Sequence, residues 1–287
     1  MSWSNYHTHS CYCDGKGELE EYIIRAKELN FNALGLSSHA PVPFDTWWTM
    51  PKEKLPSYLA EINILKQKYN DKNFTLLSSL EVDYVPEMMG PAHLDILSAK
   101  LDYIIGSVHF VDKFDSGEIW TIDSNIEVFE KGIKEIFGGD VLKAVYRYFN
   151  LQMEMIDTEP PHIIGHCDKI RMHNVKKYFF DENAKNYISK VYDLMKFSAE
   201  KGVIVEINTK YLERANLLFP AKEHFKWMRQ NKIPVTINSD AHHPDKLTEG
   251  FSEVVRLIID AGYKELWEWN GKEFSPFGFD ENGINKF

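Results

Sequence analysis

The sequence predicts an α/β fold in which seven βα units close into a TIM-like barrel. Short, near-continuous apolar runs alternate with longer amphipathic runs, a pattern typical of parallel strands covered by helices. Polar side chains recur where the apolar runs end, and a barrel brings the carboxyl ends of its strands together at one mouth. An open doubly wound sheet is the alternative, but the repeated strand-end positions favour the barrel. Because the chain shows no repeat, low-complexity run or linker, residues 1–287 are expected to form one domain.

Seven strands are expected, most of them ending beside a polar residue. The first ends at His7-Thr8-His9, and the third, residues 74–82, leads into Glu81-Val82-Asp83. The others span residues 33–39, 103–109, 163–166, 203–208 and 234–238. The tail after Leu266 is expected to hold one more short strand.

Helices are expected between the strands, because apolar residues recur there at intervals of three and four. They span residues 18–29, 56–69, 94–97, 123–149, 182–201, 220–230 and 251–261. The long segment 123–149 is expected to be interrupted at Gly138-Gly139. Pro41 and Pro43 exclude a regular element directly after the second strand.

Composition and charge limit the possible functions. Hydrophobic residues make up 44% and charged residues 26%, as in an ordinary globular enzyme. The net charge of -10 argues against an electrostatic grip on nucleic acid and against an anionic membrane surface. Three cysteines are too few for a disulfide framework, and neither a signal peptide nor a transmembrane segment is visible. A reduced, cytoplasmic protein is expected, with no nucleic-acid or membrane partner and no prediction of oligomeric state.

Histidine and acidic residues form the candidate site. His7 and His9 stand two residues apart on extended backbone, so both imidazoles face one point. Later strand ends add His39, Glu81, His109, His166, Asp240 and His242. With Asp14 in the loop after the first strand, nine candidate ligands are enough for two or three ions. Imidazole and carboxylate ligands suit Zn, Fe and Mn, and clustered ions suit phosphoryl chemistry.

Other residues of these types are expected to have ordinary roles. Solvated positions on loops or helices are expected for His93, His162, His173 and His224. His243 is expected to point away from the site, and the cysteines to serve as small packing groups. Trp47 and Trp48 lie in a polar loop between two prolines and are expected to cover the mouth as a lid.

Several motifs, in order, resemble those of the PHP (polymerase and histidinol phosphatase) superfamily. They are His7-x-His9, Ser38-His39, Glu81, Gly106-Ser107-Val108-His109, Gly165-His166-Cys167-Asp168 and Ser239-Asp240-Ala241-His242. The resemblance runs from residue 5 to residue 242. The chain length and the Glu206-Ile207-Asn208-Thr209 stretch are similar to those of the monofunctional histidinol-phosphate phosphatases of bacterial histidine biosynthesis.

The resemblance implies a distorted (β/α)7 barrel that holds three divalent ions, which could be Zn, Fe or Mn. One ion would be held by His7, His9, Glu81 and Asp240. The second would be held by Glu81, His109 and His166, and the third by Asp14, His39 and His242.

The implied reaction is the hydrolysis of a small phosphate monoester, L-histidinol phosphate, by a hydroxide that bridges two ions. Glu81, Asp240 and His242 would act at the reacting centre. Arg171 and Arg214, with Lys210, are the expected phosphate ligands, since guanidinium binds phosphate bidentately. Asp168 or a metal-bound water is the candidate general acid. Trp48, with Asp45 and Trp47, is expected to line the outer pocket, because histidinol carries an ammonium and an imidazole.

Three alternative functions are weighed against this one. A nuclease or other phosphoesterase of the same superfamily is disfavoured by the acidic charge and the lack of a basic groove. An amidohydrolase also uses His-x-His on a barrel, but commonly has a strand-4 lysine bridge where this chain offers Glu81 on the third strand. A metal-storage protein is disfavoured because storage needs no open barrel mouth.

Overall fold

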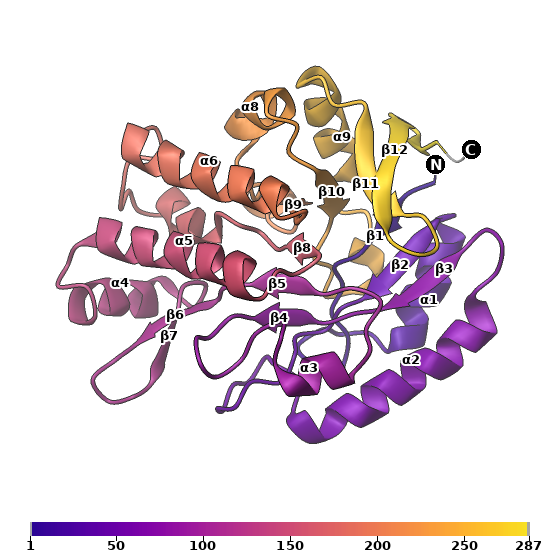
Figure 1. Ribbon diagram of the computed structural model, residues 1–287, viewed down its shortest axis with the longest axis horizontal. Coiled ribbons are helices and arrows are strands. Elements are labelled where there is room, and N and C mark those ends of the chain that lie inside the picture. Colours follow the sequence, from indigo (N-terminus) through magenta and orange to yellow (C-terminus); the bar gives the residue numbers. More distant parts are fainter. Residues whose placement is uncertain (1, 286–287) are drawn as a thin grey trace.

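A ring of parallel strands lies at the centre of the computed structural model, which describes residues 2–285. Figure 1 shows these strands with helices outside them. One parallel sheet contains β1 (Ser4–Asn5), β2 (Ala33–Leu36) and β3 (Thr75–Ser78). The second contains β4 (Glu81–Asp83), β5 (Ile105–Ser107), β8 (Ile163–Ile164), β9 (Ile204–Asn208) and β10 (Val235–Asn238). Parallel bridges Thr8–Ala241 and His39–Glu81 join the two sheets on both sides. Because β3 runs on into β4, the ring has seven positions, and the predicted barrel is confirmed.

Helices surround this ring (Figure 1). They are α1 (Leu19–Glu28), α2 (Leu55–Tyr69), α3 (Leu94–Ser98), α4 (Ile126–Glu135), α5 (Val141–Thr158), α6 (Lys185–Glu200), α7 (Leu212–Ala215), α8 (Phe225–Gln230) and α9 (Phe251–Asp260). Shorter 3-10 turns are Lys52–Lys54, Lys169–Val175, Lys222–His224 and Pro244–Lys246. Each main helix buries one apolar stripe; in α1 the buried residues Leu19, Tyr22, Ile23 and Ala26 follow the helical period. Within residues 2–285, no helix is both long and apolar enough to cross a membrane.

The third predicted strand proves to be two strands. After Ser78 the chain leaves its pairing with β2, and from Glu81 it pairs with β5 instead. The Glu81 amide donates to the carbonyls of Ser37 and Ser38, which fixes the change of direction. The prediction that Glu81 ends a strand is therefore wrong, since Glu81 begins β4. The kink nevertheless buries its carboxylate at the mouth of the ring.

The predicted helix 123–149 is also divided. Gly138 and Gly139 both take positive φ, +64° and +85°, and make the predicted interruption between α4 and α5. The second helix then continues to Thr158, beyond the predicted end, because the apolar stripe continues through Leu151, Met155 and Ile156. Before α4 lies an antiparallel hairpin that was not predicted, β6 (Phe110–Lys113) and β7 (Ile119–Thr121).

The C-terminal segment forms three strands, not the single short strand that was predicted. They are β11 (Glu265–Trp269), β12 (Phe274–Asp280) and β13 (Gly283–Ile284), all antiparallel. Trp267, Trp269 and Phe274 pack against Tyr6, Tyr103 and the first residues of several barrel strands. These aromatic side chains therefore cover the amino-terminal end of the ring. A functional site is expected at the opposite, carboxyl-terminal end.

A buried carboxylate in this closure is expected to make stability depend on pH. Glu268 is 5% exposed, and the Tyr6 hydroxyl donates to its Oε2 at 2.8 Å. Burial raises the pKa of Glu268 to about 7. The folded state therefore retains a proton that the unfolded chain loses, so this group stabilises most at low pH and loses its contribution as pH rises through 7. Glu268→Gln should stabilise the fold by about 2 kcal/mol more at pH 8 than at pH 5. Urea denaturation at both pH values checks this, and an equal effect at the two would contradict it.

Candidate metal centre

The nine predicted ligands meet at the carboxyl end of the ring. The His7 and His9 rings lie 5.0 Å apart, centroid to centroid, as the i, i+2 spacing predicts. Across the ring, His109 and His166 lie 4.8 Å apart. Four compact groups can be recognised in which the ligand atoms lie within 4.8 Å of one another. They are His9–Asp14–His39–His242, His7–His9–Asp240, His39–Asp83–His109 and Glu81–His109–His166.

Glu81 stands at the centre of the array. Its Oε2 lies 3.2 Å from His7 Nε2, 3.4 Å from His9 Nε2 and 3.0 Å from His39 Nδ1. Its Oε1 lies 2.8 Å from His166 Nε2 and accepts a hydrogen bond from the Ser107 hydroxyl at 2.6 Å. A carboxylate placed in this way faces two groups of imidazoles at once and has the position of a bridging ligand.

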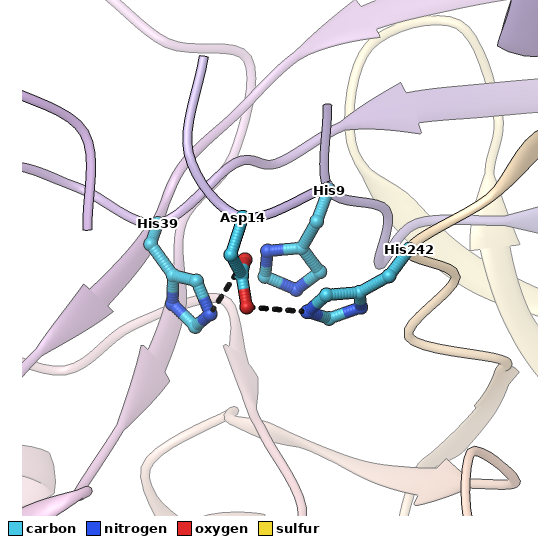
Figure 2. A group of neighbouring side chains, drawn as sticks. All are labelled: His9, Asp14, His39 and His242. Atoms are coloured by element: carbon cyan, nitrogen blue, oxygen red, sulfur yellow. Dashed lines mark ion pairs between the residues drawn. The ribbon is translucent and has the colours of Figure 1, made fainter. Parts of the chain in front are cut away.

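Asp14 comes from the loop after β1 and lies between two histidines (Figure 2). Its carboxylate oxygens are 3.2 Å from His242 Nε2 and 3.8 Å from His39 Nε2. Figure 2 also shows the His9 ring facing the same space. A loop aspartate, the weakest of the nine candidates by sequence position, thus joins the array.

The donor atoms fit divalent cations. Several are buried but have no hydrogen-bond partner among residues 2–285. They are His7 Nε2, His9 Nε2, Asp14 Oδ1, His39 Nδ1 and Glu81 Oε2. Buried polar atoms are normally paired, and imidazole nitrogen and carboxylate oxygen are the usual ligands of Zn, Fe and Mn. These atoms belong to residues of the compact groups, so divalent cations bound by those groups would satisfy them.

Two ligand candidates have strained backbones. Among the positive-φ residues, His166 has φ 25° and Asp240 has φ 49°, a region that side chains with a Cβ rarely adopt. Such conformations cost free energy and persist where the surrounding structure requires them. Here each stands two residues after the end of its strand, β8 or β10, where both side chains join the ligand groups.

A second set of carboxylates, which the sequence did not mark as functional, orients the imidazoles. Glu206 Oε1 lies 2.6 Å from His7 Nδ1, while its Oε2 accepts from the His166 amide at 2.8 Å. Asp83 Oδ1 lies 3.0 Å from His109 Nδ1. Such contacts fix the tautomer of a ligand histidine and leave its other nitrogen for a metal. Glu206 could have been found from the sequence, because it is the one acidic residue in the predicted strand 203–208.

Electrostatics keep the central carboxylates ionised. Burial alone would raise the pKa of Glu81, but His7, His39 and His109 hold it well below its usual range. The pKa of Asp240 is lowered in the same way, by Lys210 and His7 against the effect of burial. Ionised carboxylates are the form that binds metal.

The array opens into a cavity of about 400 Å³. Besides ligand candidates, its lining includes Trp47, Trp48, Thr121, Asp123, Ser124, Lys169, Lys210, Tyr211 and Arg214. Three of the predicted substrate residues, Trp48, Lys210 and Arg214, are therefore at the site.

Lys210 Nζ lies 3.1 Å from Asp240 Oδ1, and the exposed Arg214 stacks its guanidinium over the Tyr211 ring at 3.8 Å. Trp48 approaches His39 edge to face, with the ring centroids 4.5 Å apart.

Arg171 does not fit its predicted role as a phosphate ligand. Its Nε donates to Glu182 at 2.6 Å and its Nη1 to the Leu218 carbonyl at 2.9 Å, and it lines a separate cavity. Asp168, the candidate general acid, is fully buried beside Arg171 and accepts from the Ala221 amide, away from the lining of the metal cavity.

The prediction that His173 and His224 are solvated is wrong, because both pack into the protein and are nearly inaccessible.

Residues 5–210 match the model of the PHP domain. The chain belongs to the PHP domain family. The family resemblance predicted from the motifs is thereby confirmed.

Relatives with assigned names share much of the length. A Deinococcus radiodurans protein named "Probable histidinol-phosphatase" is 26% identical over 261 residues, which cover 89% of this chain and 92% of the relative. The "Histidinol-phosphatase" of Bacillus subtilis is 24% identical over 256 residues, covering 82% and 92%.

Solved structures share the fold. The hisK protein of Listeria monocytogenes superposes with a TM-score of 0.73 at 21% identity, covering 87% of this chain and 99% of its own. Histidinol phosphate phosphatase (HisK) of Lactococcus lactis, complexed with Zn, L-histidinol and phosphate, gives a TM-score of 0.64 at 18% identity, covering 100% of both chains. The chain therefore shares its fold with both proteins.

Proposed function

We propose that the protein is a metal-dependent phosphatase that hydrolyses L-histidinol phosphate to L-histidinol and phosphate in histidine biosynthesis. The observation that carries this proposal is the buried array of unpaired imidazole and carboxylate atoms around Glu81. The family and the names of the relatives, and the Zn, L-histidinol and phosphate bound to the Lactococcus lactis protein, support the choice of substrate. The proposed biosynthetic role implies a cytoplasmic location.

Three divalent ions, of Zn, Fe or Mn, are proposed. The ligand sets are His7, His9, Glu81 and Asp240; Glu81, His109 and His166; and Asp14, His39 and His242. When bound, such ions supply Lewis acidity, which polarises phosphate oxygens and lowers the pKa of water. Residues 1–287 would act as one domain, in keeping with an apolar core that runs from Trp3 to Ile284.

The residues of the chain have distinct roles in this proposal. Glu81, Asp240 and His242 hold the reacting centre. Glu206 keeps the His7 ring in the orientation that presents Nε2. Lys210 and Arg214 contribute positive charge at the mouth, where a phosphate dianion enters. Trp48 covers one side and limits the access of bulk water.

The proposal is tested by phosphate release from the metal-loaded protein. Turnover of L-histidinol phosphate should exceed that of a 3′-phosphate oligonucleotide by at least about 100-fold in kcat/KM, a difference of about 3 kcal/mol in transition-state binding. A preference for the oligonucleotide would favour the nuclease alternative. Hydrolysis of amides without hydrolysis of phosphate esters would favour the amidohydrolase alternative.

Trp48 is expected to contribute mainly to substrate binding. Its ring stacks on Phe110 at 5.2 Å between centroids and borders the cavity, whereas Trp47 is 87% exposed. Trp48→Ala should raise KM about tenfold, the effect of losing one aromatic contact, with a smaller effect on kcat. Steady-state kinetics measures this, with Trp227→Ala as the control, because Trp227 stacks on Tyr192 and does not line the cavity. Unchanged KM and kcat in Trp48→Ala would rule out the lid.

A further inference from the structure

A buried ammonium group in the metal cavity has no role in the function argued so far. Lys169 opens the 3-10 turn after β8, and its side chain is only 5% exposed. Its Nζ lies 2.8 Å from Asp123 Oδ2 and 3.1 Å from His109 Nε2. A lysine is seldom buried to this extent without a partner, and here the partner is another lining residue of the same cavity.

Asp123 reaches the cavity from the unpredicted hairpin, two residues after β7. Its Oδ2 lies 2.8 Å from Lys169 Nζ and 3.8 Å from His109 Nε2. Asp123 thus fixes the position of Lys169 by an ion pair between two separate segments. One carboxylate does not use all the hydrogen-bonding capacity of an ammonium, which carries three donors.

The second neighbour of the Lys169 ammonium, His109 Nε2, is an atom that would bind a metal ion. His109 Nε2 belongs to the Glu81–His109–His166 group, and its Nδ1 is already directed to Asp83. Once Nε2 binds a cation, its lone pair is no longer available to Lys169. A donor of the ammonium is then free for another acceptor on the cavity side, next to the ligand array.

We propose that Lys169 is a phosphate-binding residue, held by Asp123, whose ammonium donates to a phosphate oxygen of substrate and product. The inference rests on the proposed function, since it takes the ligand of the cavity to be a phosphate ester. Lys169 would fill the role that the sequence suggested for Arg171. Lys169 and Arg171 are two positions apart in the same 3-10 turn. Because such a helix has about three residues per turn, their side chains point in different directions, and only Lys169 faces the cavity.

Lys210 would provide a second cation from another strand end. Its Nζ lies 3.2 Å from His242 Nε2, beside the Asp14-containing group, whereas Lys169 lies beside the Glu81-containing group. The two ammonium groups therefore neighbour different parts of the ligand array. A phosphate above the array could be contacted by both.

A competing explanation is that Lys169 only balances the negative charge of the carboxylates in the ligand array. The two explanations differ in what Lys169→Met should change. Charge balance alone predicts altered metal content or stability with normal phosphate affinity. A phosphate ligand predicts weaker phosphate binding with metal retained.

The test uses the metal-loaded protein and inorganic phosphate, with binding measured by calorimetry and by product inhibition. Lys169→Met should weaken phosphate binding by about 10- to 100-fold, the usual effect of losing a charge-assisted hydrogen bond, and lower kcat/KM by a similar factor. Lys169→Arg should restore part of the affinity. Metal content by elemental analysis should equal that of the wild type.

Two further variants keep the result interpretable. Lys169→Met/Asp123→Asn removes both charges, so no carboxylate is left unpaired if the single variant folds poorly, and it should show the same loss of affinity. Lys66→Met is the matched control, since Lys66 is also partly buried and ion-paired, to Asp102, but lies outside the cavity. Its phosphate affinity should be unchanged.

The outcomes separate this inference from the proposed function. The inference would be overturned if Lys169→Met and Lys169→Met/Asp123→Asn both retained metal and bound phosphate with unchanged affinity. This holds even if the wild type turns over L-histidinol phosphate. Loss of metal in these variants would also overturn it in favour of charge balance. Weakened phosphate binding in a protein that does not hydrolyse L-histidinol phosphate would refute the proposed substrate and support the inference.

Discussion

Replacing Glu81 with glutamine is expected to remove turnover, with a loss in kcat of at least about 10³-fold. Both carboxylate oxygens face imidazoles, with Oε2 near His7, His9 and His39 and Oε1 near His166. An amide keeps the shape but has no charge and only one acceptor oxygen, so it cannot face both groups as a ligand. Metal content and kcat should fall together, as measured by elemental analysis and phosphate release.

Glu268→Gln is the matched control for this variant. Glu268 is a nearly inaccessible glutamate like Glu81, but it lies among the aromatic residues at the other end of the barrel. Its replacement should leave metal content and kcat near wild type. A Glu81→Gln protein with full metal content and normal kcat would show that the array is not the active site, whatever its geometry suggests.

The ligand array was largely predictable because its spacing carries information. A His-x-His pair on extended backbone must present both rings to one side, and parallel strands must end at the same face. These two rules brought His7, His9, His109 and His166 together without any knowledge of the barrel's dimensions. Asp14 was only a possible further ligand in the loop after the first strand, and the family resemblance then implied its place in the third ligand set.

The residues that escaped prediction lack such a pattern. Lys169 and Asp123 are common surface types, and their burial depends on a hairpin and a 3-10 turn that apolar periodicity does not reveal. Sequence distance after His166 made Arg171 attractive, but it says nothing about direction once the chain coils. The Arg171 guanidinium instead donates hydrogen bonds to Glu182 and to the Leu218 carbonyl.

The strand predictions failed where tertiary pairing overrides local pattern. Residues 74–82 suggest a single strand, yet the chain changes partner between Ser78 and Glu81. The C-terminal strands failed for a related reason, since Trp267, Trp269 and Phe274 are placed by the end of the barrel that they cover. Local propensity cannot report a contact with residues more than a hundred positions earlier in the chain.

Removing the metal ions with a chelator is expected to destabilise the protein as well as inactivate it. Glu81, Asp240 and Asp14 lie close together, and Glu206 and Asp83 stand directly behind the imidazoles. Without cations these ionised groups repel one another, and the free energy of metal binding is lost from the folded state. A ligand present at about 1,000 times its Kd stabilises by about 4 kcal/mol.

For a chain of this size, such a loss corresponds to a fall in Tm of about 10 °C. Differential scanning calorimetry before chelation, after chelation and after readdition of Zn or Mn measures it, and readdition should restore both Tm and turnover. The same treatment of Glu81→Gln should change Tm much less, because that variant is expected to hold little metal beforehand. If elemental analysis shows the wild type free of metal while Tm and turnover stay unchanged, the buried carboxylates must be balanced by protonated histidines and the two lysines alone, and the metal centre would have to be abandoned.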